Sequence, residues 1–142
     1  MNLEQLQTMW KSDSVLSDTL HDEDSLKIPQ LHMKYMEFYN TFALMKKEKE
    51  MEMRRLTKEK WLYYKGKAPA AVYKEMPFDY KLTAKDEISM FIEADDEVQK
   101  VQYKIDYIEQ VLFFLDGVLR MINNRTYHIK NAIECKRFNA GY

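Results

Sequence analysis

Apolar side chains recur at alternating three- and four-residue steps along two long stretches of the chain. In the C-terminal third, the pattern runs from Val98 to Ile133 and is interrupted only at Asn123-Asn124. A second run extends from Leu31 to Met45. Side chains at these steps lie on one face of a helix. The pattern therefore predicts two long helices, over residues 29–65 and 95–138.

The first long helix has recognisable ends. Pro29 suits the first turn of a helix, where its missing N–H costs nothing. No helix breaker follows until Gly66, a residue typical of helix C-termini. At 1.5 Å per residue, a helix over 29–65 is about 55 Å long. Such a length is typical of extended bundles rather than of small globular domains.

The rest of the chain reads as shorter pieces. Leu3, Leu6 and Trp10 predict a short amphipathic N-terminal helix. The Ser/Asp-rich remainder of residues 1–28 reads as an acidic linker. Gly66, Pro69 and Pro77 mark 66–94 as a loop region. Its second part, 79–94, fits both a strand and a helix, and the sequence leaves the two open.

Composition supports one fold class. The 142 residues include only three Gly and three Pro, which disfavours turn-rich β folds. We predict an all-α fold with a single domain, residues 1–142, built of long antiparallel helices and a short N-terminal helix. A single cysteine, a start without a signal-peptide pattern, and no apolar run of roughly 20 residues predict a soluble cytosolic protein.

The segment 111–122 carries a second apolar stripe beside the first. A helix that is apolar on two sides must be covered on two sides, and two long helices with a few short ones do not provide enough cover. We therefore predict self-association, with this helix at the subunit boundary. The predicted oligomerisation residues are Ile105, Ile108, Val111, Leu112, Phe114, Leu115, Val118, Leu119 and Ile122.

Charge changes the picture because the formal net charge of −1 hides a strong partition. Residues 46–67 carry nine Lys/Arg against four acids, whereas 1–30 and 75–97 are acidic. A protein that coats nucleic acid by bulk charge would be basic throughout. This chain can bind an acidic partner only through a defined patch.

The basic stretch has one cationic face that carries an aromatic residue. On a helical wheel, one stripe about 80° wide holds Lys47, Met51, Arg54, Lys58, Trp61 and Lys65, opposite Met45, Leu56 and Tyr63. Lys60 falls away from Lys58. Cations that follow phosphates and aromatic rings that stack on unpaired bases are typical of single-stranded nucleic acid binding. The alternative is a solvated face whose charges pair at i, i+4, such as Glu50 with Arg54.

No constellation predicts catalysis, a metal or a cofactor. Three scattered glycines exclude a phosphate loop of the GxxxxGK[ST] type. The three histidines and Cys135 lack the spacing of a four-ligand metal site. The acids Asp95, Asp96 and Glu97 fit a helix start better than a two-carboxylate catalytic site. We therefore expect a protein that is not an enzyme.

Four segments, in order and spacing, resemble the UvsY family of recombination mediators from T-even-type bacteriophages. They are LEQLQ with Lys11 and Asp13 after it, KEKWLYYKG (58–66), ADDEVQKV (94–101) and RTYHIKNAI…KRFNAG (125–141). The resemblance covers nearly the whole chain. The loop after Gly66 departs most from the family pattern.

The resemblance implies a factor for DNA recombination and repair that binds single-stranded DNA in the cytoplasm of an infected bacterial host. It also implies a homo-oligomeric ring of six or seven subunits, a hexamer or heptamer. Such mediators displace the phage single-strand-binding protein and load the phage recombinase. The family's DNA-binding motif matches Lys58 and Lys60, and its C-terminal helix is tied to oligomerisation. The expected DNA-binding residues are Arg54, Arg55, Lys58, Lys60, Trp61, Tyr64, Lys65 and Lys67.

Two other functions remain open from the sequence. The basic face could bind an acidic protein surface, which would make the chain a protein-interaction scaffold. The long helices could also serve a purely structural coiled-coil assembly. Neither reading gives the chain a specific role on DNA.

Overall fold

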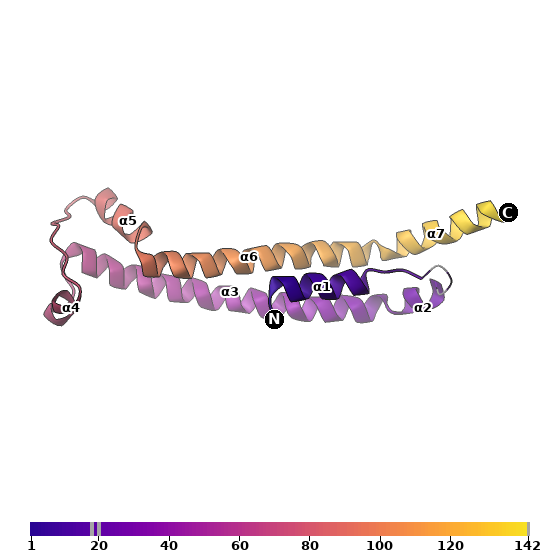
Figure 1. The fold of residues 1–142 in the computed structure, drawn as a ribbon, viewed down its shortest axis with the longest axis horizontal. Helices are drawn as coiled ribbons and strands as arrows, with labels where there is room; N and C mark the ends of the chain where they lie inside the picture. Colours follow the sequence, from indigo (N-terminus) through magenta and orange to yellow (C-terminus); the bar gives the residue numbers. More distant parts are fainter. Residues whose placement is uncertain (18, 20, 142) are drawn as a thin grey trace. The chain divides into compact units, whose positions relative to one another are not determined.

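The structure is a computed structural model that describes residues 1–17, 19 and 21–141. Seven helices and no strand make up the secondary structure of these residues (Figure 1). The helices are α1 Leu3–Asp13, α2 His21–Leu26, α3 Ile28–Lys65, α4 Ala70–Glu75, α5 Lys85–Glu93, α6 Asp96–Asn123 and α7 Arg125–Asn139. The all-α prediction is confirmed.

The chain divides into two compact units. Unit 1 comprises Met1–Ala43 and Glu109–Tyr142, and unit 2 comprises Leu44–Ile108. The long helices α3 and α6 each contribute to both units, and their segments run antiparallel within each unit (Figure 1). No helix in the described part of the chain holds a stretch long and apolar enough to cross a bilayer.

In unit 1, the helix α1 begins at a capping box. The Asn2 side chain accepts a hydrogen bond from the Gln5 backbone N–H, and the Gln5 side chain accepts one from the Asn2 N–H, each at 2.9 Å. This exchange satisfies two backbone donors that a helix start leaves without partners. Leu6 on α1 is fully buried, and the Trp10 ring meets Tyr35 of α3 edge-on at 5.5 Å.

α1 also lies beside part of the second apolar stripe of α6. Val111 and Val118 are buried, and a groove between the two helices is lined by Trp10 of α1 and by Phe114 and Val118 of α6. α1 therefore covers part of this stripe, whereas Met121 at its end stays 49% exposed. Self-association itself stays a prediction.

The predicted oligomerisation residues pack mostly within the chain. Seven are buried and two, Leu112 and Phe114, are half-buried. The apolar side chains that α6 of unit 1 leaves exposed are different ones, Phe113 at 79% and Met121 at 49%. Phe113 lies outside the three-four pattern, whereas Met121 continues the second stripe three residues after Val118 but is not in the predicted set.

The predicted helix over 95–138 is interrupted at Asn124, which separates α6 from α7. The interruption places the Arg125 side chain inside unit 1, where it donates to the backbone oxygens of Asp13 at 3.0 Å and Val15 at 3.1 Å. Asp13 ends α1, so the guanidinium meets the negative end of a helix dipole. The apolar pattern is interrupted at the same place, Asn123-Asn124, although the predicted helix runs through it.

Two segments predicted as irregular contain helices. The acidic linker includes α2, whose first turn holds Asp22, Glu23 and Asp24, and acids are favoured at that end of a helix. The loop region includes α4 and α5. In α5, Ile88 and Ile92 are buried together with Val98, which settles the strand or helix ambiguity in favour of a helix.

Candidate nucleic-acid interface

The basic stretch forms the last turns of α3, which end at Gly66. Gly66 has a φ of +84°, a left-handed conformation that glycine adopts without steric cost. The Gly66 N–H donates to the Tyr63 oxygen at 3.1 Å, and the Lys67 N–H donates to the Leu62 oxygen at 2.8 Å. This pair of bonds is a Schellman motif. It reverses the chain and brings Lys67 back beside the helix.

One face of these turns is open to solvent. Arg54 and Lys58 are exposed, and the indole of Trp61, one further turn along, is 38% exposed. The Lys67 ammonium lies 5.4 Å from the centre of the Trp61 ring, which places a cation over an aromatic face. The predicted cationic and aromatic face is therefore present in the structure, while its contact with DNA stays a prediction.

Two predicted members of the face are placed at its edges. Lys65 is half-buried, and its ammonium donates to the Thr83 backbone oxygen at 3.5 Å. Arg55 is exposed but lies about 100° around the helix from Arg54. There it lines a groove with Lys100 and Lys104 of α6. On the opposite side of α3, Leu56 packs against the core of unit 2, as the helical wheel predicted.

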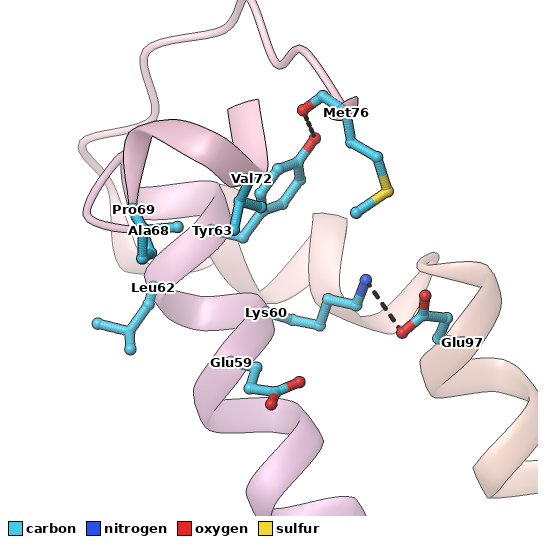
Figure 2. A pocket seen from close by; sticks show the side chains of 9 residues that line it. All are labelled: Glu59, Lys60, Leu62, Tyr63, Ala68, Pro69, Val72, Met76 and Glu97. Atoms are coloured by element: carbon cyan, nitrogen blue, oxygen red, sulfur yellow. Dashed lines mark hydrogen bonds and ion pairs between the residues drawn. The ribbon is translucent and has the colours of Figure 1, made fainter. Parts of the chain in front are cut away.

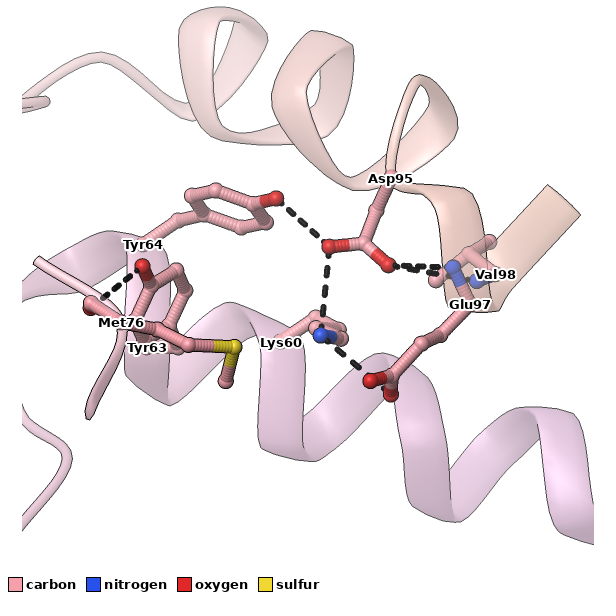
Figure 3. Close-up of polar contacts among 7 residues, drawn as sticks. All are labelled: Lys60, Tyr63, Tyr64, Met76, Asp95, Glu97 and Val98. Carbon is pink, nitrogen blue, oxygen red and sulfur yellow. Dashed lines mark hydrogen bonds and ion pairs between the residues drawn. The ribbon is translucent and has the colours of Figure 1, made fainter. Parts of the chain in front are cut away.

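Lys60 and Tyr64 turn inward instead (Figure 3). The Lys60 residue is 8% exposed, and its ammonium lies 3.3 Å from Asp95 and 3.4 Å from Glu97. The Tyr64 hydroxyl donates to Asp95 at 2.6 Å. As placed here, neither side chain has a free polar end for a phosphate or base. The helical wheel carried this signal, because Lys60 fell near the apolar side.

Asp95 is the centre of this cluster. One carboxylate oxygen accepts from Lys60 and Tyr64, and the other accepts from the backbone N–H groups of Glu97 at 2.9 Å and Val98 at 3.3 Å. The second pair of bonds caps the start of α6, as the acids at 95–97 predicted. Asp95 thereby joins α6 to the end of α3.

Ionisation in the cluster follows from these contacts. Burial acts to raise the pKa of Asp95. The hydrogen bonds from Tyr64, from the backbone N–H of Val98 and from Lys60 outweigh burial and lower that pKa. Burial likewise acts to lower the pKa of Lys60, yet the bonded Asp95 carboxylate raises it above its usual value. Burial and the bond to Asp95 both raise the pKa of Tyr64. All three groups therefore keep their ordinary neutral-pH charges.

Aromatic rings hold the segment after Gly66 against the end of α3. Tyr63 stacks on Tyr73 of α4 with ring centres 5.4 Å apart. Tyr64 meets Phe78 at 5.0 Å and Phe91 of α5 at 5.6 Å. Tyr64 is thus a packing residue of unit 2. The sequence reasoning missed this cluster because its members come from four separate segments.

A cleft of about 330 Å³ opens beside Lys60 (Figure 2). Its walls are largely apolar and include Leu62, Val72 and Met76. The Tyr63 hydroxyl is tied to the Met76 backbone oxygen at 2.8 Å. The cleft holds no nucleophile and base pair, and no group of three His, Cys, Asp or Glu in the described ranges is placed to hold a metal ion.

A family model described as the recombination, repair and single-stranded-DNA-binding protein UvsY matches residues 9–142. The chain belongs to the UvsY family. It is 26% identical to the recombination protein UvsY of Enterobacteria phage T4 over 144 residues, which cover 99% of each protein. The resemblance seen in the four sequence segments is confirmed.

Solved structures of a UvsY relative share the fold. A crystal structure of the bacteriophage T4 recombination mediator protein UvsY matches with a TM-score of 0.85 at 25% identity, over 99% of each chain. A second crystal form matches with a TM-score of 0.84 at 22% identity, over 95% of this chain and 98% of that chain. Membership of the UvsY family thus comes with the UvsY fold along nearly the entire chain.

Proposed function

We propose that this protein binds single-stranded DNA and promotes loading of a phage recombinase onto DNA coated by single-strand-binding protein. The observation that carries the proposal is the exposed face of Arg54, Lys58 and Trp61, with Lys67 folded over the indole. Cations beside an accessible aromatic ring suit a strand whose bases are unpaired. The activity is non-enzymatic and belongs to the cytoplasm of the infected host.

In the proposed mechanism, the cations neutralise phosphates and Trp61 stacks on a base. Lys60 contributes indirectly, because its contacts hold the end of α3 against α6. A chain with a net charge of −1 offers only a small patch. A homo-oligomeric ring of about six or seven subunits would join several such patches, and each further contact would become intramolecular.

Exposed apolar side chains support the self-association part of the proposal. Phe113 of α6 is 79% exposed, and large apolar side chains in that state are favourable to bury. Phe113→Ser should give smaller species in light scattering, with and without single-stranded DNA. Met90→Ser, at an exposed position on α5, is the matched control. A large species that persists in Phe113→Ser would contradict a role for this residue in assembly.

DNA binding is tested by fluorescence anisotropy with a labelled oligonucleotide over a salt series. Lys58→Ala should reduce the slope of log affinity against log salt by about 0.7 for one lost phosphate contact per subunit. Trp61→Ala should cost about 1–3 kcal/mol for one stacked base, and Trp61→Phe should recover part of it. Lys130→Ala, an exposed cation on α7, serves as the control. Unchanged slopes and affinities for both sites would identify a solvated face.

The loading step needs a separate assay. Strand exchange by the purified phage recombinase on DNA coated with single-strand-binding protein should be stimulated by the wild type and less by Lys58→Ala. DNA binding without stimulation would leave a simple DNA binder and refute the mediator role. Failure to bind single-stranded DNA at physiological salt would favour a protein-interaction scaffold.

A further inference from the structure

The groove that Arg55 lines lies between α3 and α6 of unit 2. Its volume is about 360 Å³, and Arg55 on α3 faces it together with Lys100 and Lys104 on α6. All three cations are exposed. Lys100 and Lys104 are one turn apart, about 6 Å along the helix axis, so each can meet a different phosphate.

These cations have no close ion-pair partner, although Lys104 attracts the Glu52 carboxylate at longer range. Across the described part of unit 2, none of Arg55, Lys100 and Lys104 forms an ion pair within 4.0 Å. An arginine offers a flat fork of donors that matches a phosphate, and a lysine acts as a compact point charge. The groove therefore has one bidentate anion donor on one wall and two point charges on the other.

Two of the three carboxylates in the groove are already held by lysines. Glu52 lies 2.9 Å from Lys49, and Glu97 lies 3.4 Å from Lys60 (Figure 3). Glu59 has no such partner among the residues described. The groove itself is lined by three cations and three carboxylates. Their ion-pair partners add two cations, Lys49 and Lys60, and one carboxylate, Asp95. Together these five cations and four carboxylates leave one positive charge.

We infer that this groove binds the phosphodiester backbone of single-stranded DNA, with Arg55, Lys100 and Lys104 as the phosphate contacts and Glu59 as the group that weakens them. The inference rests on the proposed function and extends its binding face. Arg54 and Arg55 are consecutive on α3, about 100° apart around the helix. One strand can therefore pass from the exposed face into the groove.

The test is the double variant Lys100→Ala/Lys104→Ala in the full chain, titrated with labelled single-stranded DNA between 50 and 200 mM salt. Two lost phosphate contacts reduce the salt slope by about 1.4. Over this range, the wild type should lose about sevenfold more affinity than the double variant. Lys74→Ala/Lys81→Ala removes two exposed cations of unit 2 outside the groove and should leave the slope unchanged. Circular dichroism and urea unfolding verify that both variants fold.

Glu59→Gln provides a gain-of-function test that misfolding cannot imitate. Removal of the unpaired carboxylate should tighten DNA binding about two- to fivefold at low salt. Unchanged DNA affinity in Glu59→Gln overturns the role of the groove. The same holds if the lysine double variant keeps the wild-type salt slope while Lys58→Ala lowers it. Either result leaves the proposed function standing. A wild type that does not bind single-stranded DNA overturns both. If the lysine double variant binds poly-glutamate more weakly but binds single-stranded DNA as the wild type does, the ligand of the groove is an acidic protein and not DNA.

Discussion

Lys58 and Lys60 are two residues apart on α3, yet the structure predicts opposite consequences for their loss. Lys58 is exposed, whereas the Lys60 ammonium is buried between Asp95 and Glu97. Replacement of Lys60 by Met keeps the apolar stem of the side chain and removes the charge. The Asp95 carboxylate then loses its cationic partner.

The magnitude follows from what Asp95 keeps. Removal of one partner from a buried ion pair costs about 3–5 kcal/mol when the other charge is left uncompensated. Asp95 retains the Tyr64 hydroxyl and two backbone N–H donors, so the loss approximates one charged hydrogen bond, about 1.5–3 kcal/mol. We expect Lys60→Met to lower the free energy of unfolding by about 2–3 kcal/mol. Lys58→Met should stay within about 0.5 kcal/mol of the wild type.

Urea unfolding measures both variants, and Asp95→Asn completes a double-mutant cycle. Asparagine still caps α6 through its one oxygen, and its NH2 group takes the place of the oxygen that accepts from Lys60 and Tyr64, so this change removes the charge together with that acceptor. The double variant Lys60→Met/Asp95→Asn should lose less free energy of unfolding than the sum of the two single variants. The difference, which is the coupling energy, should be about 1–2 kcal/mol. In DNA titrations, Lys58→Met should lower the salt slope and Lys60→Met should not. A lower slope with unchanged stability in Lys60→Met would refute the reasoning and make Lys60 a direct DNA contact.

Two further predictions concern acid stability and chain reversal. Because the folded-state pKa of Asp95 is lowered below its unfolded value of about 3.9, its contribution is present above that pH and lost as the pH falls through the folded value. Urea midpoints should therefore fall as the pH drops below about 4, and they should fall less in Asp95→Asn. Equal losses in the two proteins would show that this carboxylate does not contribute to acid stability. Gly66→Ala should lower the free energy of unfolding by about 1–2 kcal/mol because its φ is +84°. Gly117→Ala, within α6 and with open space at its Cβ, should raise it by about 0.5–1 kcal/mol; similar thermal shifts in both alanine variants would contradict the role of φ.

The first long helix was predictable from the sequence because helix formation depends on residues three and four positions apart, whereas the second predicted helix is broken at Asn124. The predicted range 29–65 compares with Ile28–Lys65 in the structure. The exposed cationic face was predictable for the same reason, since one wheel places Arg54, Lys58 and Trp61 together. The short helices were less predictable. In α5, Ile88 and Met90 fitted a strand until packing buried Ile88 and left Met90 exposed.

The candidate site was only partly visible in the sequence. Local charge along the chain is high in residues 46–67 and points to that segment. Lys100 and Lys104 lie in a segment of mixed charge, so local charge does not point to them. Their relation to Arg55 depends on how α3 and α6 pack. The partial coverage of the second stripe of α6 by α1 depends on packing in the same way.

For this protein, the sequence by itself determined the helical class, the solvent-facing basic stripe and the family. These rest on short-range periodicity and on the order of motifs along the chain. The tertiary structure decided which of the neighbouring lysines faces solvent and which is buried in an ion pair. It also placed Arg125 on the carbonyl of Asp13, 112 residues earlier in the chain. Such pairings depend on distance in space, because a buried charge requires a partner that chain packing alone brings near.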